Sequence, residues 1–66
     1  MDKQVYIERI KVWYPEASHR RDAASWVAGA RFAEKNTELE AFLTKAFLQI
    51  IDLSYEDFMN WLEGQK

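Results

Sequence analysis

The chain has 66 residues, of which 48% are hydrophobic and 30% charged, and its formal net charge is −2. This length allows one domain, residues 1–66, and the apolar fraction is too high for an intrinsically disordered chain. The absence of cysteine excludes a disulfide framework, and a single histidine is too few for a zinc site built from histidine and cysteine. The slightly acidic balance provides no overall basic field for nucleic acid or an anionic membrane.

The small size of the chain limits the stability that its core can supply. Below about 70–80 residues, a single hydrophobic core rarely supplies more than about 3–5 kcal/mol. Aromatic residues nevertheless make up 15% of this sequence. We therefore expect an unusually aromatic core, an oligomer, or stabilisation by a partner.

The first predicted element is a helix over residues 2–14. Asp2 is a suitable N-cap, and Pro15 disfavours helical geometry at the residue before it, which predicts the end of the helix at Tyr14. A strand is the alternative, because Val, Tyr and Ile favour strands, but strict alternation of apolar and polar residues fails here. The apolar face of the helix, within about 120° of arc at 100° per residue, comprises Tyr6, Ile7, Ile10, Trp13 and Tyr14.

The second predicted helix covers residues 20–35, with Asp22 as a plausible N-cap. Gly29 lies in its middle, where glycine is unfavourable by about 1 kcal/mol relative to alanine. We interpret Gly29 and its alanine neighbours as a place where another helix approaches closely. The expected core face comprises Ala23, Trp26, Val27, Ala30 and Ala33, and a separate stripe comprises Ala24, Ala28 and Phe32.

The third predicted helix covers residues 38–52 and has the clearest pattern. Thr37 and Glu40 have the spacing of a capping box, with Thr37 as N-cap. Apolar residues then follow at helical spacing. They are Leu39, Phe42, Leu43, Ala46, Phe47, Ile50 and Leu53, with Ile51 beside them.

The fourth predicted helix covers residues 55–63, with Ser54 and Asp57 as a variant capping box and Gly64 as C-cap. Its apolar face comprises Tyr55, Phe58, Met59 and Leu62. Short connections make sequential helices pack against one another. The sequence therefore predicts an all-α fold, a compact bundle of three to four short helices (approximately 2–14, 20–35, 38–52 and 55–63).

Most aromatic side chains fall on the expected core faces, but three large apolar residues do not. Phe32, Leu48 and Trp61 each lie away from the main apolar stripe of their helix. Isolated exposed apolar residues are ordinary, and a helix that buries two faces would also account for Phe32. The other interpretation is a contact surface, where aromatic residues and arginine are enriched.

His19, Arg20 and Arg21 form the single cationic cluster of the sequence. A solvated turn whose arginines pair with nearby carboxylates is the simpler interpretation. An acidic partner is the functional one. The predicted partner-binding residues are thus Arg20, Arg21, Phe32, Leu48 and Trp61.

The expected function is that of a small non-enzymatic protein-interaction module, a regulator or inhibitor that binds a protein partner or a second copy of itself. The alternative is a nucleic-acid-binding domain, which needs a wide basic face. The residues that could form such a face are Arg9, Lys11, Arg20, Arg21 and Arg31. Binding of nucleic acid is disfavoured by the acidic residues that neighbour these cations in the chain.

No residue pattern predicts catalysis, a metal or a cofactor. Glu16 and His19 have E-x-x-H spacing, but a di-iron site needs two such motifs and further carboxylates. A pocket lined by both residues would revive an enzyme hypothesis. No apolar leader follows Met1 and no apolar run approaches the length of a membrane span, so we expect a cytoplasmic protein with no membrane partner.

Overall fold

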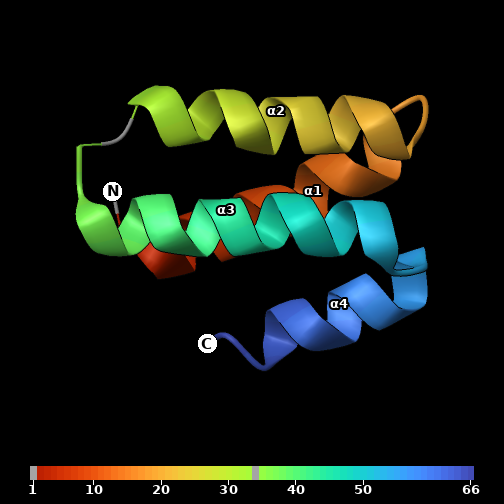
Figure 1. Ribbon diagram of the computed structural model, residues 1–66. Helices are drawn as coiled ribbons and strands as arrows, with labels where there is room; N and C mark the ends of the chain where they lie inside the picture. Colours follow the sequence, from red (N-terminus) through yellow and green to blue (C-terminus); the bar gives the residue numbers. More distant parts are fainter. Residues whose placement is uncertain (1, 34) are drawn as a thin grey trace.

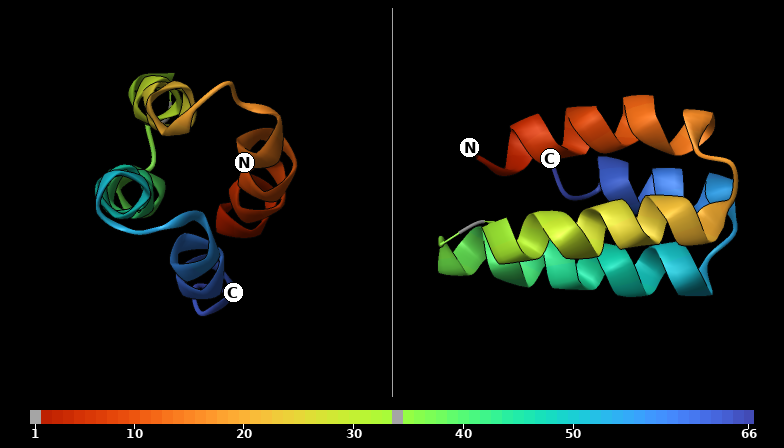
Figure 2. Two further views of the ribbon diagram at one scale, coloured as in Figure 1. Left: turned by 90° about the vertical axis from the view of Figure 1, so that its right-hand side faces the viewer. Right: turned by 90° about the horizontal axis from the view of Figure 1, so that it is seen from above.

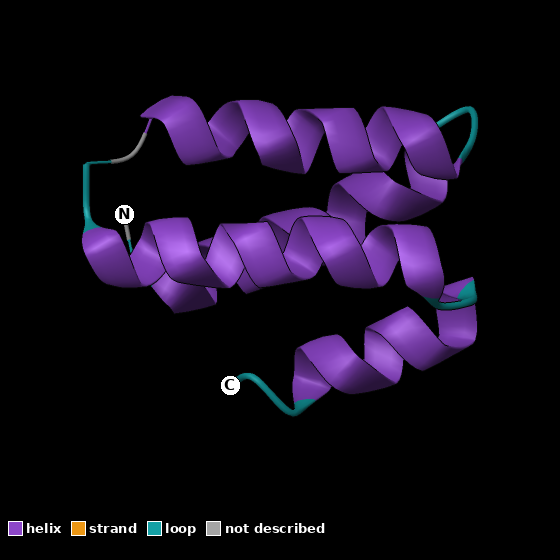
Figure 3. Cartoon of the chain, in the orientation of Figure 1, coloured by secondary structure: helices purple, strands orange, loops and turns teal. Residues whose placement is uncertain are grey.

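The computed structural model describes residues 2–33 and 35–66, and it confirms the all-α fold (Figures 1 and 3). No strand occurs among these residues. The four helices are α1 (Lys3–Glu16), α2 (Arg20–Ala33), α3 (Thr37–Asp52) and α4 (Tyr55–Glu63).

The helices form one closed bundle. α2 and α3 run antiparallel and side by side along most of their length, and they make the most extensive interface in the molecule. α1 lies across the core from this hairpin, and the shorter α4 packs against both α3 and α1 (Figure 2). Seen end-on, the helices surround a single core, so every helix has one buried side and one outward side.

The core receives side chains from all four helices. Its fully buried members include Ile7, Val27, Leu43, Ile50 and Phe58. The ring of Phe58 lies 5.5 Å from that of Tyr14 and 5.7 Å from that of Trp61, measured between centroids. Aromatic rings thus join α1 to α4, which compensates for the small number of residues available to fill the core.

Three predicted helix caps are confirmed. The Asp2 carboxylate accepts a hydrogen bond from the Val5 N–H at 3.0 Å, and the Ser54 hydroxyl accepts one from the Asp57 N–H at 3.2 Å. Gly64 is the C-cap of α4, and its N–H donates to the Asn60 carbonyl. Each bond satisfies a backbone group that the end of a helix leaves without an intrahelical partner.

The predicted cap of the third helix is wrong by one residue. The N-cap is Asn36, whose side-chain oxygen accepts hydrogen bonds from Glu38 N–H at 2.9 Å and Leu39 N–H at 3.2 Å. Thr37 is the first helical residue. Asn and Thr are both good N-caps, but Asn ranks above Thr. Their adjacency explains both the correct position of the helix and the error in its cap.

The predicted end of the first helix at Tyr14 is also wrong, because α1 continues through Pro15 to Glu16. The Tyr14 ring is buried and forms an edge contact with Tyr55, with centroids 5.0 Å apart. This packing holds Tyr14 in helical geometry against the local preference that precedes proline. Proline removes one intrahelical bond in the last turn, and the Ala17 N–H closes the helix on the Tyr14 carbonyl at 3.1 Å.

Helix α2 begins at Arg20, as predicted, but Asp22 lies in its first turn rather than at the N-cap. It ends at Ala33, and Lys35 is not helical; Glu34, the other residue of the predicted end, lies outside the described residues. Gly29 does not mark a close approach, because a Cβ atom added there would meet nothing within 4 Å.

Several residues that the sequence predicts to lie in the core are at the surface. Trp13 is 55% exposed and Tyr55 is 45% exposed, and Ala33 is also exposed. Trp13 lies at the edge of the predicted apolar arc, and the centre of that arc supplies the buried residues. They are Tyr6, Ile7, Ile10 and Tyr14.

Charged side chains form ion pairs between α1 and the C-terminal end of the chain. Lys11 pairs with Glu63, and the Lys66 ammonium lies 3.1 Å from Glu63 and 3.8 Å from Glu8. The nearby Lys66 side chain, together with burial, lowers the pKa of Lys11, and Glu8 opposes this effect. Exposed pairs of this kind contribute little to stability.

Candidate interaction surface

Two arginines on one stripe of α2 fasten this helix to α3. The Arg20 guanidinium donates to the Ile51 carbonyl at 3.2 Å, and the Arg31 guanidinium donates to the Thr44 hydroxyl at 3.5 Å. These arginines are eleven positions apart, which places them within about 20° of each other around the helix. The Arg20 bond also satisfies a carbonyl at the C-terminal turn of α3, where a cation is favourable.

Arg31 also orders the neighbouring aromatic ring. Its guanidinium carbon lies 4.6 Å from the centroid of the Phe32 ring, within the range of a cation–π interaction. The Phe32 side chain is nevertheless 77% exposed, the highest value among the large hydrophobic residues that the structure describes. Phe32 therefore presents most of its ring to solvent from a partly fixed position.

The outward side of the α2–α3 hairpin carries both predicted contact residues of these helices. Phe32 lies about 100–120° around α2 from the two seam arginines, Arg20 and Arg31. Leu48 lies about 40–60° around α3 from their partners, Thr44 and Ile51, and both side chains are turned away from the core. Arg21 occupies the same side of α2, and Ile51 borders it on α3. We call this surface, made of Arg21, Phe32, Leu48 and Ile51, the hairpin face.

The hairpin face is apolar along its length and basic at one end. Leu48 is 50% exposed and Ile51 46% exposed. Beside them runs a shallow depression of about 550 Å³, whose described lining includes three basic residues and no carboxylate. The lining residues are His19, Arg20, Arg21, Ala24, Ser25, Phe47 and Ile51. This chemistry suits an apolar group with a neighbouring negative charge.

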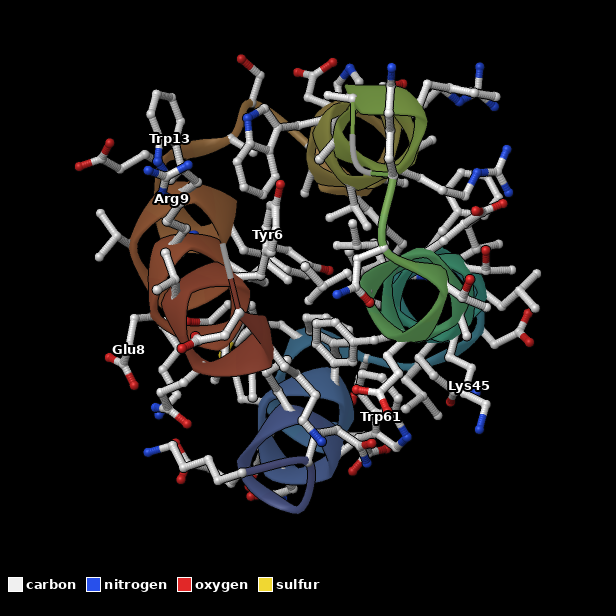
Figure 4. The ribbon with its side chains drawn as sticks, turned by 90° about the vertical axis from the view of Figure 1, so that its left-hand side faces the viewer. Tyr6, Glu8, Arg9, Trp13, Lys45 and Trp61 are labelled. Atoms are coloured by element: carbon white, nitrogen blue, oxygen red, sulfur yellow. The ribbon has the colours of Figure 1, made fainter. Side chains whose placement is uncertain are left out.

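The structure brings four of the five predicted partner-binding residues onto the hairpin but leaves Trp61 apart. Trp61 is half-buried on α4 and packs against the core. Its ring stacks on Phe42 and on Phe58, with centroid distances of 6.2 and 5.7 Å. Figure 4 shows Trp61 where α4 meets the rest of the bundle. Trp61 therefore lies away from the hairpin residues with its ring partly covered, and its role in partner binding stays a prediction.

Arg20 needs a narrower interpretation than the sequence suggested. Its hydrogen bond to Ile51 makes it a structural link between helices, whereas no hydrogen bond or ion pair engages the Arg21 side chain among the described residues. Ile51 is a residue of the hairpin face that the sequence pattern did not indicate as a contact residue. Its position beside the main apolar stripe of α3 indicates that it could lie at the border of the core. Whether it is exposed depends on where α2 packs against α3.

The five cations of the nucleic-acid alternative do not share one face. Arg9 and Lys11 are two positions apart on α1, which turns them about 200° from each other. Lys11 is paired with Glu63, while Arg20 and Arg31 are directed along the α2–α3 seam. These side chains therefore do not form the continuous basic face that nucleic-acid binding needs.

The Glu16 and His19 pair does not form a shared site. His19 lies 3.6 Å from Asp22, measured between Nε2 and Oδ1, and lines the depression beside the hairpin face. Glu16 lines a different groove on the other side of α2. Within residues 2–33 and 35–66 there is no group of three or more His, Asp and Glu residues arranged to hold a metal.

Comparison with protein-family models, with curated proteins and with solved structures finds no match. None of the described helices has the length and apolar character needed to span a membrane. The surface chemistry of this chain is therefore the basis for inferring its function.

Proposed function

We propose that this protein is a small non-enzymatic interaction module that acts as a regulator or inhibitor by binding a protein partner, or a second copy of itself, through the hairpin face. The observation that carries the proposal is the exposure of Phe32 at 77% together with Leu48 at 50% on one outward surface. The two residues lie about seven positions apart along the antiparallel hairpin, roughly 10 Å at 1.5 Å per residue.

The rigid setting of this surface supports the proposal. Arg20 and Arg31 hold the two helices together at both ends of the face. Little conformational entropy is therefore lost when a partner binds. Aromatic residues and arginine are the usual anchors of protein interfaces. The expected compartment is the cytoplasm, a reducing environment that suits a chain without cysteine.

The test is affinity capture from cells of the native host, combined with sedimentation equilibrium of the purified protein. The double variant F32A/L48A is compared with the parent and with Val12→Ala, which truncates an exposed apolar residue on α1. We expect the parent and V12A to retain the same partner or dimer, and the double variant to lose it by at least about tenfold in affinity. Equal assembly by the double variant, with helicity unchanged, would overturn the proposal.

A further inference from the structure

A second apolar groove lies between α1 and α2, on the side of α2 that faces away from the hairpin face. Its volume is about 370 Å³, which is within the range of about 300–1,000 Å³ found for small-molecule sites. Its floor reaches the core through Ile10, Val27 and Ile50, all of which are buried. The groove is thus an opening onto the core rather than a feature of one flexible loop.

Two tryptophans form the wall of this groove. The rings of Trp13 and Trp26 are stacked, with centroids 6.0 Å apart and planes inclined by 13°. Trp26 is half-buried, whereas Trp13 is 55% exposed. Figure 4 shows Trp13 on the flank of α1 nearest α2, with Tyr6 directed between the helices. A ligand that covered Trp13 would remove a large apolar surface from water.

The charged residues of the groove have one sign. Glu16, at the end of α1, and Asp22, in the first turn of α2, both line it, and the described lining contains no basic side chain. Arg9, one turn before Trp13, does not line the groove, but it lines a neighbouring depression on α1 to which Trp13 also contributes. Asp22 is close to His19, but the Glu16 side chain makes no ion pair or hydrogen bond with another described residue.

Indole faces attract cations, and nearby carboxylates add to that attraction. We propose that this groove binds a small organic cation with an aromatic or branched aliphatic body. The apolar body lies against Trp13 and Trp26, and the ammonium group lies toward Glu16 and Asp22. This site goes beyond the hairpin face and does not depend on it, because the two surfaces lie on different sides of α2 and carry opposite charge.

The test compares three probes with the same aromatic body: 2-phenylethylammonium, 2-phenylethanol and phenylacetate. Binding is followed by the fluorescence of a Trp61→Phe protein, in which the tryptophans that remain are the two in the groove. In the parent protein, the indole N–H signals in the NMR spectrum report the same event without a substitution. We expect saturable binding of the ammonium probe, with an affinity about tenfold above that of phenylacetate and perturbation centred on Trp13 and Trp26.

Substitutions then separate charge from shape. Glu16→Gln and Asp22→Asn should each weaken ammonium binding by about three- to tenfold and leave 2-phenylethanol binding unchanged. The matched control is Glu38→Gln, which neutralises an exposed carboxylate at the start of α3. Equal affinity for the ammonium and the carboxylate probe, or no saturable binding of the ammonium probe, would overturn this inference. Neither result bears on the proposed function of the hairpin face, which the F32A/L48A variant tests separately.

Discussion

At the scale of single residues, adjacent side chains of the same type have different roles. Arg20 donates a hydrogen bond to the Ile51 carbonyl, whereas Arg21 is exposed on the hairpin face. A hydrogen bond from an exposed charged group to the end of a helix contributes about 1 kcal/mol. The two positions therefore provide a matched pair for testing what the structure assigns to each arginine.

Replacing Arg20 by Ala should lower the free energy of unfolding by about 1 kcal/mol, because the C-terminal turn of α3 loses a donor. The same replacement at Arg21 should change it by less than about 0.5 kcal/mol. Urea denaturation followed by circular dichroism measures both values. Equal losses for the two variants would contradict the structural role of Arg20.

At the scale of helices, local sequence signals predicted the positions of the elements well, but they predicted less well how the helices pack against one another. The caps at Asp2 and Ser54 lie at the predicted positions, because a cap depends on residues within one turn. The continuation of α1 through Pro15 depends instead on the burial of Tyr14 against α4. Tertiary contact outweighed the local preference there, and no signal within α1 could have shown it.

Gly29 provides a test of helix energetics that is free of packing. Since nothing lies within 4 Å of a Cβ atom built at this position, Gly29→Ala should raise the free energy of unfolding by about 0.5–1 kcal/mol. Denaturant titration measures the change, and Ala41→Gly, an exposed position on α3, should lower it by a similar amount. A destabilising G29A substitution would restore the interpretation of Gly29 as a close helix contact.

At the scale of the whole molecule, stability depends on a core that is small and rich in rings. Phe58 is fully buried and contacts rings from two helices, whereas Phe32 is 77% exposed. Truncation of a buried phenylalanine costs about 3–5 kcal/mol, which is comparable to the total stability expected for a chain of this size. Replacement by alanine should thus unfold the protein at Phe58 and leave its stability nearly unchanged at Phe32.

We expect Phe58→Ala to abolish cooperative thermal unfolding and most of the native helicity at 25 °C, because the cavity exceeds what the small core can tolerate. Phe32→Ala should keep the parent melting curve to within a few degrees. Thermal denaturation followed by far-ultraviolet circular dichroism compares the two variants directly. A folded F58A protein, or an unfolded F32A protein, would contradict the assigned core.

The sequence by itself determined the all-α class, a bundle of three to four helices, their approximate bounds and most of the core, because helical periodicity and capping residues act over a few positions. It also identified Phe32 and Leu48 as residues that no helix buries on its main apolar face. Only the tertiary structure decided that Trp61 is packed, that Trp13 is exposed and that Arg20 is engaged with α3. Those outcomes depend on the distance and rotation between helices, which arise from side-chain packing across the whole bundle and are not encoded in any single segment.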